Sequence, residues 1–408
     1  MFSSDHLWCG PTNHTLITNA SYDWSLLSKL NEDKATLYMP VIISVAVLMV
    51  IGTIGNILVI YIYNWRLKRR SANLFIGTMA IFDLLSCVIA MPVEILDLSN
   101  PYMFYSGAIC KLFRFAESIT VYGSAMILVL IAFDRYFKIC KPLRILPLSR
   151  IKLMCGLAGF LAILFSVPAF ILFGITCSDT SVIGLRGYDC SISEDYKGGP
   201  FQQVYFTTLI IMFIAAFSCM IGFYIRLWIE IKHRRDTVIS DHVTSPKSPA
   251  VVRKFKVSRN STSDDESASN SQVTAEMSKK SKRLASIAET SPQIKLSRTT
   301  LIFFSVSIVF IVSYLPGIVI NIFRAVKPDY HSSMTPGEEV MMKFLTRTYL
   351  ISNSANPFVY SFLNTNFRSQ CRKLFSSVVY CCKQTMERET SPGLRKKSKE
   401  SQQSGTER

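Results

Sequence analysis

Long apolar runs alternate with short polar segments along the 408-residue chain. A helix needs about 20 apolar residues to cross roughly 30 Å of hydrocarbon. Runs of this length cover residues 37–63, 74–96, 108–133, 153–175, 204–225, 300–323 and 340–363. These runs lack the alternation of strands, and backbone groups in lipid must be hydrogen-bonded within the protein, so the runs are expected to be helices. The pattern therefore predicts an all-α membrane protein built as a seven-transmembrane helix bundle.

The last of these runs is the weakest, because Arg347 and several Ser, Thr and Asn residues interrupt it. A protein with six spans is the alternative. Composition agrees with the membrane class, since 49% of the residues are hydrophobic and only 18% are charged. The net charge of +17 suits anionic lipid headgroups once the chain is placed in a membrane, so no nucleic-acid partner is expected.

Lysine and arginine gather in alternate loops. They are Arg66, Lys68, Arg69 and Arg70 after the first run, and Arg135, Lys138, Lys141, Arg144, Arg150 and Lys152 around the end of the third. The loop between Asp97 and Ile109 has neither residue. Basic loops of a membrane protein face the cytoplasm. The expected protein is therefore a multi-pass protein of the plasma membrane, with an extracellular N-terminus and a cytoplasmic C-terminus.

The ends of the chain and one internal loop are polar. Residues 1–36 are expected to form an extracellular tail, glycosylated at the sequons of Asn13 and Asn19. Inside the transmembrane domain, 37–363, the segment 230–297 is rich in serine and charge. Such a composition cannot bury enough apolar area to fold, so this segment is predicted to be a disordered third cytoplasmic loop.

The chain continues after the seventh run with a different pattern. Apolar residues at helical spacing in 364–380 predict a short amphipathic eighth helix lying on the membrane surface. The cytoplasmic tail, 381–408, begins with Cys381 and Cys382, which are candidates for palmitoylation. An unmodified, reduced pair is the alternative.

Eleven cysteines divide between the two sides of the membrane. Those expected on the oxidising face are Cys9, Cys110, Cys177 and Cys190. Four cysteines allow three pairings, and spacing alone does not choose among them.

Charged groups inside membrane helices are costly and usually functional. Asp83 lies in the middle of the second run, and Ser124 and Asn356 are candidate neighbours. Their oxygen atoms suit a small hard cation, which predicts a sodium site with no other metal. A hydrogen-bond acceptor used only for packing is the alternative for Asp83.

Two acids, Glu94 and Glu117, are placed to line the outer half of the bundle, with Asp97 beside them. Two explanations remain open. The acids are neutralised within the protein, the candidate partners being Arg114, Arg324 and Arg347, or they meet a basic group on a ligand.

Prolines at positions 92, 168, 316 and 357 interrupt long helices and favour kinks. A bundle with several hinges and no repeated ionic path favours a conformational switch over a pore. A channel or transporter is therefore the rival interpretation from another class.

The sequence gives no support for an enzyme, because the five histidines lie outside the spans and no nucleophile stands near a base.

Several short motifs follow one another in a fixed order. They are Gly55-Asn56, Asp83, Cys110, Asp134-Arg135-Tyr136, the "NPFVY" of Asn356 to Tyr360, and Phe367. In this order and spacing the chain resembles the rhodopsin-like (class A) G-protein-coupled receptors over residues 37–382. The resemblance implies an agonist-driven switch that activates a heterotrimeric G protein, with receptor kinases and arrestin as further partners.

The resemblance also assigns roles to residues of this chain. The arginine is held by its acidic neighbour at rest and released toward two tyrosines on activation. The implied switch residues are Asp134, Arg135, Tyr136, Tyr224, Phe310, Tyr314, Pro316, Asn356, Pro357 and Tyr360. The G-protein contacts are Arg135, Pro142 and Leu143. By the same analogy Cys110 pairs with Cys190, which leaves Cys177 and Cys9 for a second bridge.

The chain departs from the family pattern at several positions. Tyr314 replaces a tryptophan in the sixth helix, Ala216 a proline in the fifth and Gly159 a tryptophan in the fourth. The family pattern includes a triad of core residues. In this chain Ala125 stands at the apolar position of that triad, and Phe310 is its only typical member. Signal transmission is therefore expected to differ in detail.

Leu350 stands where a light receptor of this family has its retinal lysine, so an opsin is excluded. Amine receptors usually have aspartate in place of Glu117, which leaves a biogenic-amine receptor as an alternative. The acidic outer vestibule and the cysteine-containing loop 176–200, which is expected to form a hairpin, favour a neuropeptide with a basic residue, for example one amidated at its C-terminus. The candidate ligand-binding residues are Glu94, Asp97, Glu117, Asn321 and Arg324.

Overall fold

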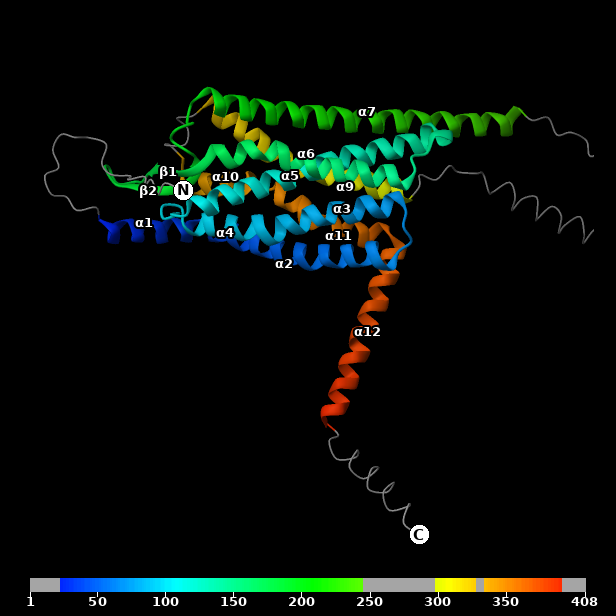
Figure 1. The fold of residues 1–408 in the computed structure, drawn as a ribbon, viewed down its shortest axis with the longest axis horizontal. Coiled ribbons are helices and arrows are strands. Elements are labelled where there is room, and N and C mark those ends of the chain that lie inside the picture. The colour runs from blue at the N-terminus through cyan, green and yellow to red at the C-terminus, as the bar shows by residue number, and fades with distance from the viewer. Residues whose placement is uncertain (1–22, 245–297, 328–333, 391–408) are drawn as a thin grey trace, which may run out of the picture.

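A computed structural model describes residues 23–244, 298–327 and 334–390. Long helices lie side by side in one bundle, and a two-stranded hairpin covers one of its ends (Figure 1). Of the described helices and their continuations, six are long and apolar enough to cross a membrane. We call the covered end the hairpin end, and the other, where Arg135 lies, the Arg135 end.

The spans follow the predicted order. They are α2 (Met39–Tyr61) with the π-helical turn η1 (Ile62–Arg66), α3 (Ser71–Leu85) continued by the π turn η2 (Ser86–Ala90) and α4 (Met91–Ser99), α5 (Gly107–Cys140), α6 (Leu148–Leu172), α7 (Pro200–Thr244) and α9 (Arg298–Val326). A single 3-10 turn, η3 (Pro142–Arg144), follows α5. Pro168 and Pro316 lie inside α6 and α9, as the sequence predicts.

The seventh span consists of two helices, α10 (Pro336–Leu345) and α11 (Tyr349–Leu363). The Thr346 hydroxyl donates to the Met342 carbonyl over 2.9 Å, and the Thr348 hydroxyl donates to the Leu345 carbonyl over 2.9 Å. Such side-chain bonds compete with the helical hydrogen-bond ladder. The polar interruption that weakens this run in the sequence is therefore the place where the helix breaks.

The central helix is α5, which contacts α3, α6, α7 and α9. Small residues let neighbouring backbones approach closely. A Cβ atom at Gly55 of α2 would lie 2.7 Å from the Cγ atom of Pro357 in α11. The Gly-Asn pair in the first span is thus a contact point between the first and seventh spans.

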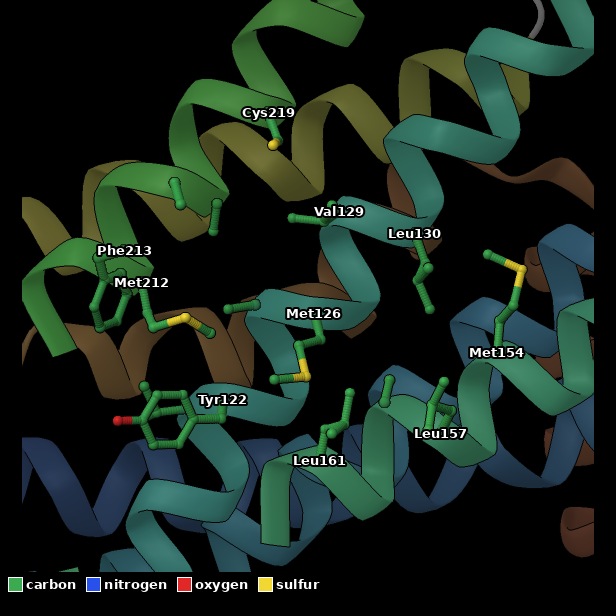
Figure 2. A pocket seen from close by; sticks show the side chains of 15 residues that line it. Tyr122, Met126, Val129, Leu130, Met154, Leu157, Leu161, Met212, Phe213 and Cys219 are labelled. Atoms are coloured by element: carbon green, nitrogen blue, oxygen red, sulfur yellow. The ribbon is translucent and has the colours of Figure 1, made fainter. Parts of the chain in front are cut away.

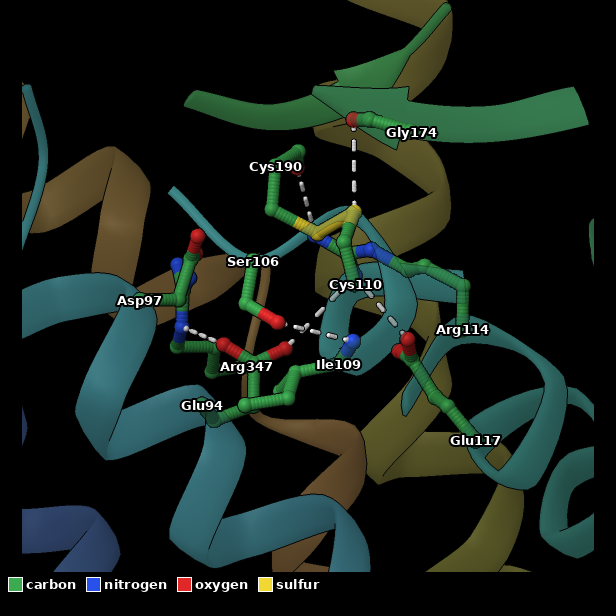
Figure 3. Close-up of a disulfide and its surroundings, with 10 residues drawn as sticks. All are labelled: Glu94, Asp97, Ser106, Ile109, Cys110, Arg114, Glu117, Gly174, Cys190 and Arg347. Carbon is green, nitrogen blue, oxygen red and sulfur yellow. Dashed lines mark hydrogen bonds and ion pairs between the residues drawn. A yellow bond between two sulfur atoms is a disulfide. The ribbon is translucent and has the colours of Figure 1, made fainter. Parts of the chain in front are cut away.

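The loop after α6 forms the hairpin expected there. Strands β1 (Phe173–Asp179) and β2 (Arg186–Ile192) pair antiparallel, with Cys177 opposite Tyr188 and Cys190 opposite Ile175. Because pairing begins at Phe173, the fourth span ends three residues before the predicted 175. A disulfide joins Cys110 at the start of α5 to Cys190 of β2 (Figure 3). Cys177 is also disulfide-bonded; its expected partner, Cys9, lies outside the described residues.

The predicted polar tail contains a helix that the sequence analysis missed, α1 (Trp24–Leu37). The Asp23 side chain caps it by accepting a hydrogen bond from the Leu26 amide. The Asn31 side chain donates to the Ser99 carbonyl over 3.4 Å and accepts from the Tyr102 amide over 3.0 Å. The sequons of Asn13 and Asn19 lie outside the described residues.

Two helices extend further than predicted. Helix α7 continues to Thr244, past the predicted loop boundary at 230, and projects beyond the other helices (Figure 1). The rest of that loop, 245–297, lies outside the described residues. Where the sequence predicts an amphipathic helix over 364–380, α12 (Thr365–Thr390) leaves the bundle at a steep angle and includes Cys381 and Cys382.

The contact between Gly55 and Pro357 predicts a position-dependent effect of adding one methyl group. Gly55→Ala should lower the free energy of unfolding by about 1–3 kcal/mol, because the rigid proline ring cannot move aside. Gly156→Ala is the matched control, since a Cβ atom there meets nothing within 4 Å and alanine favours a helix. The midpoint of thermal unfolding in detergent is measured for both variants, with dye labelling of the buried Cys87 and Cys155 as the signal. Equal midpoints would contradict the prediction.

Candidate functional site

A cavity of about 420 Å³ opens at the hairpin end of the bundle. We call it the vestibule; its lining comes from α4, α5, β1, β2, α7, α9, α10 and α11. All five predicted ligand-binding residues line it: Glu94, Asp97, Glu117, Asn321 and Arg324. Further charged residues in the lining are Arg114, Asp189, Lys343 and Arg347.

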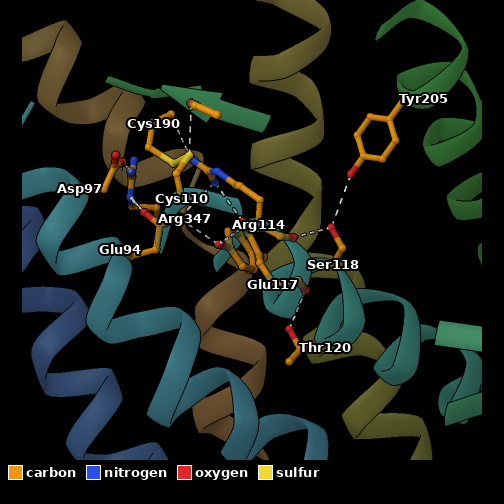
Figure 4. Close-up of polar contacts among 12 residues, drawn as sticks. Glu94, Asp97, Cys110, Arg114, Glu117, Ser118, Thr120, Cys190, Tyr205 and Arg347 are labelled. Carbon is orange, nitrogen blue, oxygen red and sulfur yellow. Dashed lines mark hydrogen bonds and ion pairs between the residues drawn. A yellow bond between two sulfur atoms is a disulfide. The ribbon is translucent and has the colours of Figure 1, made fainter. Parts of the chain in front are cut away.

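Two arginines pair with three acids in the vestibule wall (Figure 4). Arg347 lies 2.7 Å from Glu94 and 3.3 Å from Asp97. Arg114 lies 2.9 Å from Glu117 and 3.8 Å from Glu94. Helices that are distant in sequence, α4 and α5 on one side and the α10–α11 break on the other, are thereby held together.

The Tyr349 hydroxyl links the two glutamates. It donates to Glu117 Oε1 over 2.7 Å and lies 3.4 Å from Glu94 Oε1. Glu94 is almost completely buried, so its charge has to be compensated inside the protein. Of the two explanations that the sequence left open, the structure shows internal neutralisation, by Arg114 and Arg347.

Three charged lining residues form no ion pair within 4 Å among the described residues: Asp189, Arg324 and Lys343. The Arg324 guanidinium donates from Nε to the Met342 sulfur over 3.0 Å, and the Lys343 ammonium lies 5.2 Å from the centre of the Tyr38 ring. Neither contact neutralises a charge. The four acids and four bases of the lining carry formal charges that sum to zero, whereas the sequence predicts an acidic vestibule.

Aromatic side chains form the floor of the vestibule. Tyr314 stacks at 4.3 Å between ring centres on Phe310, and its ring centre lies 5.7 Å from that of Tyr349. Phe213 of α7 contacts the same tyrosine at 5.5 Å. Phe310 belongs to the main buried core, so the floor connects the vestibule with the packing between helices.

Buried polar side chains also occur in the spans, on α2, α3, α5 and α11. Asn356 donates from Nδ2 to Asp83 Oδ2 over 2.8 Å. Asp83 Oδ1, Ser124 Oγ, Asn356 Oδ1 and Asn56 Oδ1 are buried and have no hydrogen-bond partner in the part of the chain that the structure describes. The predicted neighbours Asp83 and Asn356 are therefore in contact, and several oxygens have unused bonding capacity.

At the Arg135 end, Asp134 and Arg135 are both buried. Arg135 Nε donates to Asp134 Oδ2 over 3.1 Å, and Nη2 contacts the same oxygen. Lys138, one turn later on α5, donates to that oxygen over 2.9 Å and also contacts Ser71. The guanidinium carbon of Arg135 lies 5.1 Å from the centre of the Phe303 ring of α9. The arginine is thus held by its neighbour.

The two tyrosines expected to receive this arginine have other partners here. The Tyr224 hydroxyl lies 3.1 Å from the Ser307 hydroxyl. Tyr360 is buried against Tyr63 and Phe367, at 5.8 and 6.4 Å between ring centres. Tyr136 packs on Phe137 and Phe223. Pro142 and Leu143 form the turn η3, in which the Leu143 side chain is completely exposed.

The sequence analysis missed several residues of these sites. Lys138 could have been found, because it stands four residues after Asp134 on the same helix face. Ser71, Asp189, Lys343 and Tyr349 had no local signal. Each reaches its site only through the packing of a different element.

This chain is similar in sequence to several known receptors. The neuropeptide F receptor of Drosophila melanogaster is 26% identical over 339 residues, which are 80% of this chain and 60% of that receptor. The neuropeptide S receptor of Rattus norvegicus is 29% identical over 206 residues, 49% of this chain and 54% of the relative. The growth hormone secretagogue receptor type 1 of Oryctolagus cuniculus is 32% identical over 134 residues, 31% of this chain and 36% of the relative.

Each of these matches spans less than two thirds of the relative's own length. The family described as 7 transmembrane receptor (rhodopsin family) matches residues 55–360, which is more than half of the chain. That range begins within α2, ends within α11 and contains the Gly-Asn, Asp-Arg-Tyr and Asn-Pro motifs. This protein belongs to the rhodopsin family of seven-transmembrane receptors.

Proposed function

We propose that the protein is a plasma-membrane receptor that binds an extracellular peptide and activates a heterotrimeric G protein. The observation that carries this proposal is the buried Asp134–Arg135 pair at one end of a bundle that has an open, charged vestibule at the other. Relatives named as neuropeptide receptors support the peptide ligand. The basic loops support an orientation with the hairpin end outside.

The ligand would enter the vestibule and contact Asn321 and Arg324 near its opening, with Glu94, Asp97 and Glu117 in its wall. Those acids already have arginine partners, so a basic ligand group would have to displace an arginine from a buried pair. Arg324 and Lys343 have no carboxylate within 4 Å in the described chain. An acidic side chain or a free C-terminal carboxylate of the peptide would pair with these two cations, and a basic group would pair with Asp189, which has no ion pair in the described chain.

The switch would operate on the contacts at the Arg135 end. Asp134 accepts from both Arg135 and Lys138, which favours the held arrangement. A ligand that pushes on Tyr314 acts on Phe310 and hence on the packing of α9 beside Arg135. If α9 moves, the guanidinium loses the Phe303 ring and can reach the hydroxyls of Tyr224 and Tyr360. Pro316 and Pro357, in α9 and α11, are the expected hinges.

The surface offered to the G protein would include Arg135, Pro142 and Leu143. A fully exposed leucine in water is unfavourable, which suits a side chain that inserts into a partner. Receptor kinases and arrestin, palmitoylation of Cys381 and Cys382, lipid headgroups near the basic loops, and glycosylation of Asn13 and Asn19 belong to the same proposal.

A sodium ion fits the buried cluster of Asp83, Ser124 and Asn356. All the unpartnered atoms there are oxygens, one of them from a carboxylate, and hard cations prefer such donors. The ion would satisfy these oxygens and hold the second, third and seventh spans together. No other cofactor is proposed.

A biogenic-amine receptor is not favoured. An amine ligand needs an available carboxylate in the outer part of the third helix, whereas Glu117 is bonded to Arg114 and Tyr349. A channel or transporter is not favoured either, because the acids are engaged in pairs between neighbouring helices.

A screen of a neuropeptide library tests the proposed function, with each peptide made both as the free acid and as the amide, and with calcium and cyclic-nucleotide readouts. Arg135→Ala should abolish agonist-stimulated nucleotide exchange and leave surface expression unchanged. Arg368→Ala, at the exposed start of α12, is the control and should respond normally. If the Arg135 variant still drives exchange, the proposed switch is wrong.

Two arginines of the vestibule should differ in their roles. Arg324→Met should weaken agonist potency by about tenfold or more, because it removes a cation that would pair with the ligand. The midpoint of thermal unfolding should not change. Arg347→Met should lower stability by about 3–5 kcal/mol, since it leaves Asp97 buried without an ion-pair partner and Glu94 with only the 3.8 Å contact to Arg114. Dose–response curves and thermal unfolding of both variants separate these effects. The assignment fails if Arg324→Met unfolds as easily as Arg347→Met.

Sodium should stabilise the receptor against heat through Asp83. Sodium chloride should raise the midpoint of the wild-type protein above that in choline chloride at equal ionic strength, because an ion that binds only the folded state shifts the equilibrium toward it. Asp83→Asn should remove this difference. A sodium effect of unchanged size in the variant would rule out this carboxylate as a ligand.

A further inference from the structure

A second cavity, of about 360 Å³, lies between α5, α6 and α7 (Figure 2). Two of its lining residues, Ala125 and Ala216, are positions at which the sequence departs from the family pattern. Ala158 of α6 and Ala215 of α7 also line it. Small side chains on three facing helices leave unfilled space that larger ones would occupy.

The rest of the lining is almost entirely apolar. It consists of Val121, Tyr122, Met126, Val129, Leu130, Met154, Leu157, Leu161, Met212, Phe213 and Cys219. In Figure 2 the Tyr122 hydroxyl points away from Met126 and Leu161. Water needs two or more polar partners to stay in a cavity, so this one excludes water and suits an apolar molecule.

The cavity is at the level of the hydrocarbon. From Val121 to Leu130 it extends about 14 Å along α5 at 1.5 Å per residue, close to half of the roughly 30 Å hydrocarbon thickness. Leu157, Ala215 and Cys219 are exposed on the outer surface of the bundle, so the cavity communicates with the surrounding lipid. We propose that it binds one acyl chain of a membrane lipid.

A chain fits this cavity better than a sterol does. A sterol carries a hydroxyl that seeks a polar partner at the interface, and the lining offers only Tyr122 and Cys219 near the middle of the span. Three methionines, Met126, Met154 and Met212, line the walls, and their flexible side chains adapt to an irregular, bending ligand. A cavity left empty would forfeit dispersion contacts on every wall.

Two residues belong to both cavities. Val121 and Phe213 line the vestibule as well as the acyl-chain site. Phe213 contacts Tyr314 and Phe217, and Phe217 contacts Phe310 at 6.2 Å between ring centres. An occupant that fixes Phe213 therefore biases the aromatic floor of the vestibule. This regulatory part of the inference rests on the proposed function, whereas binding of the chain does not.

The test uses the full-length receptor in phosphatidylcholine nanodiscs with a palmitic acid that carries a photoreactive diazirine on its chain. Irradiation should label peptides that contain Met126, Met154 and Met212, and excess unlabelled palmitic acid should compete. Ala216→Leu fills the cavity and should reduce this labelling by about fivefold or more. Gly222→Leu is the matched control on the same helix, since it faces open space, and should be labelled like wild type.

Several results would overturn the site. These are labelling spread evenly over all lipid-facing helices without competition, equal labelling of Ala216→Leu and wild type, or displacement of the fatty acid by cholesterol. The competition arm needs only the wild-type protein, so the proposal stays testable if Ala216→Leu does not fold.

A second readout tests the regulatory part. Basal nucleotide exchange on a purified heterotrimer should change in Ala216→Leu and stay at the wild-type level in Gly222→Leu. Normal labelling with unchanged exchange would overturn the coupling and leave the site intact. Loss of exchange in every variant and in wild type would instead count against the proposed function, because labelling requires neither agonist nor G protein.

Discussion

Hydrocarbon offers no hydrogen-bond partner, so every polar group in the spanning part of this bundle has to be satisfied inside the protein. This constraint explains why Glu94, Asp97 and Glu117, the acids at the hairpin end of the second and third spans, are bonded to arginines. Glu94 is almost fully buried, and the 2.7 Å contact with Arg347 together with Arg114 compensates its charge. The same contacts join α4 and α5 to the break between α10 and α11. The interaction that lowers the cost of a buried charge therefore also fixes where the seventh span lies.

The proposed functions lie where this pairing is incomplete or reversible. Arg324 and Lys343 have no acid within 4 Å in the described chain, so both cations would be open to an anionic group of a ligand. Asp83 and its neighbours keep oxygens without partners, which suits a cation. The pair of Asp134 and Arg135 is complete, but it joins adjacent residues on one helix, so it can open without separating two helices.

The apolar packing between α5, α6 and α7 differs from the polar contacts. Alanines face one another there, so there is no polar group to satisfy and no large side chain fills the space. Lipid tails are as apolar as the lining, so the membrane itself supplies a suitable occupant. The cavity shares Phe213 with the vestibule, and in this way a departure in side-chain volume reaches the residues that line the vestibule.

The apolar runs determined the helical membrane fold and the approximate spans, because these depend on local length and composition, and the order of the short motifs indicated the family. The hairpin and its bridge from Cys110 to Cys190 were also expected. Helix α1 was not, since its apolar pattern is weak and Asn31 is bound by residues of a distant loop. The continuation of α7 to Thr244 was missed because its polar sequence resembles a loop.

The tertiary structure alone decided which charges neutralise each other. From the sequence, Arg114, Arg324 and Arg347 were equivalent candidates for the acids of the vestibule. Packing places Arg114 and Arg347 within 4 Å of carboxylates and leaves Arg324 beside a methionine, so three acids of the vestibule are engaged within the protein. Coulomb interactions in a medium of low polarity depend steeply on distance, and distances between helices are set by packing, which no local pattern of residues encodes.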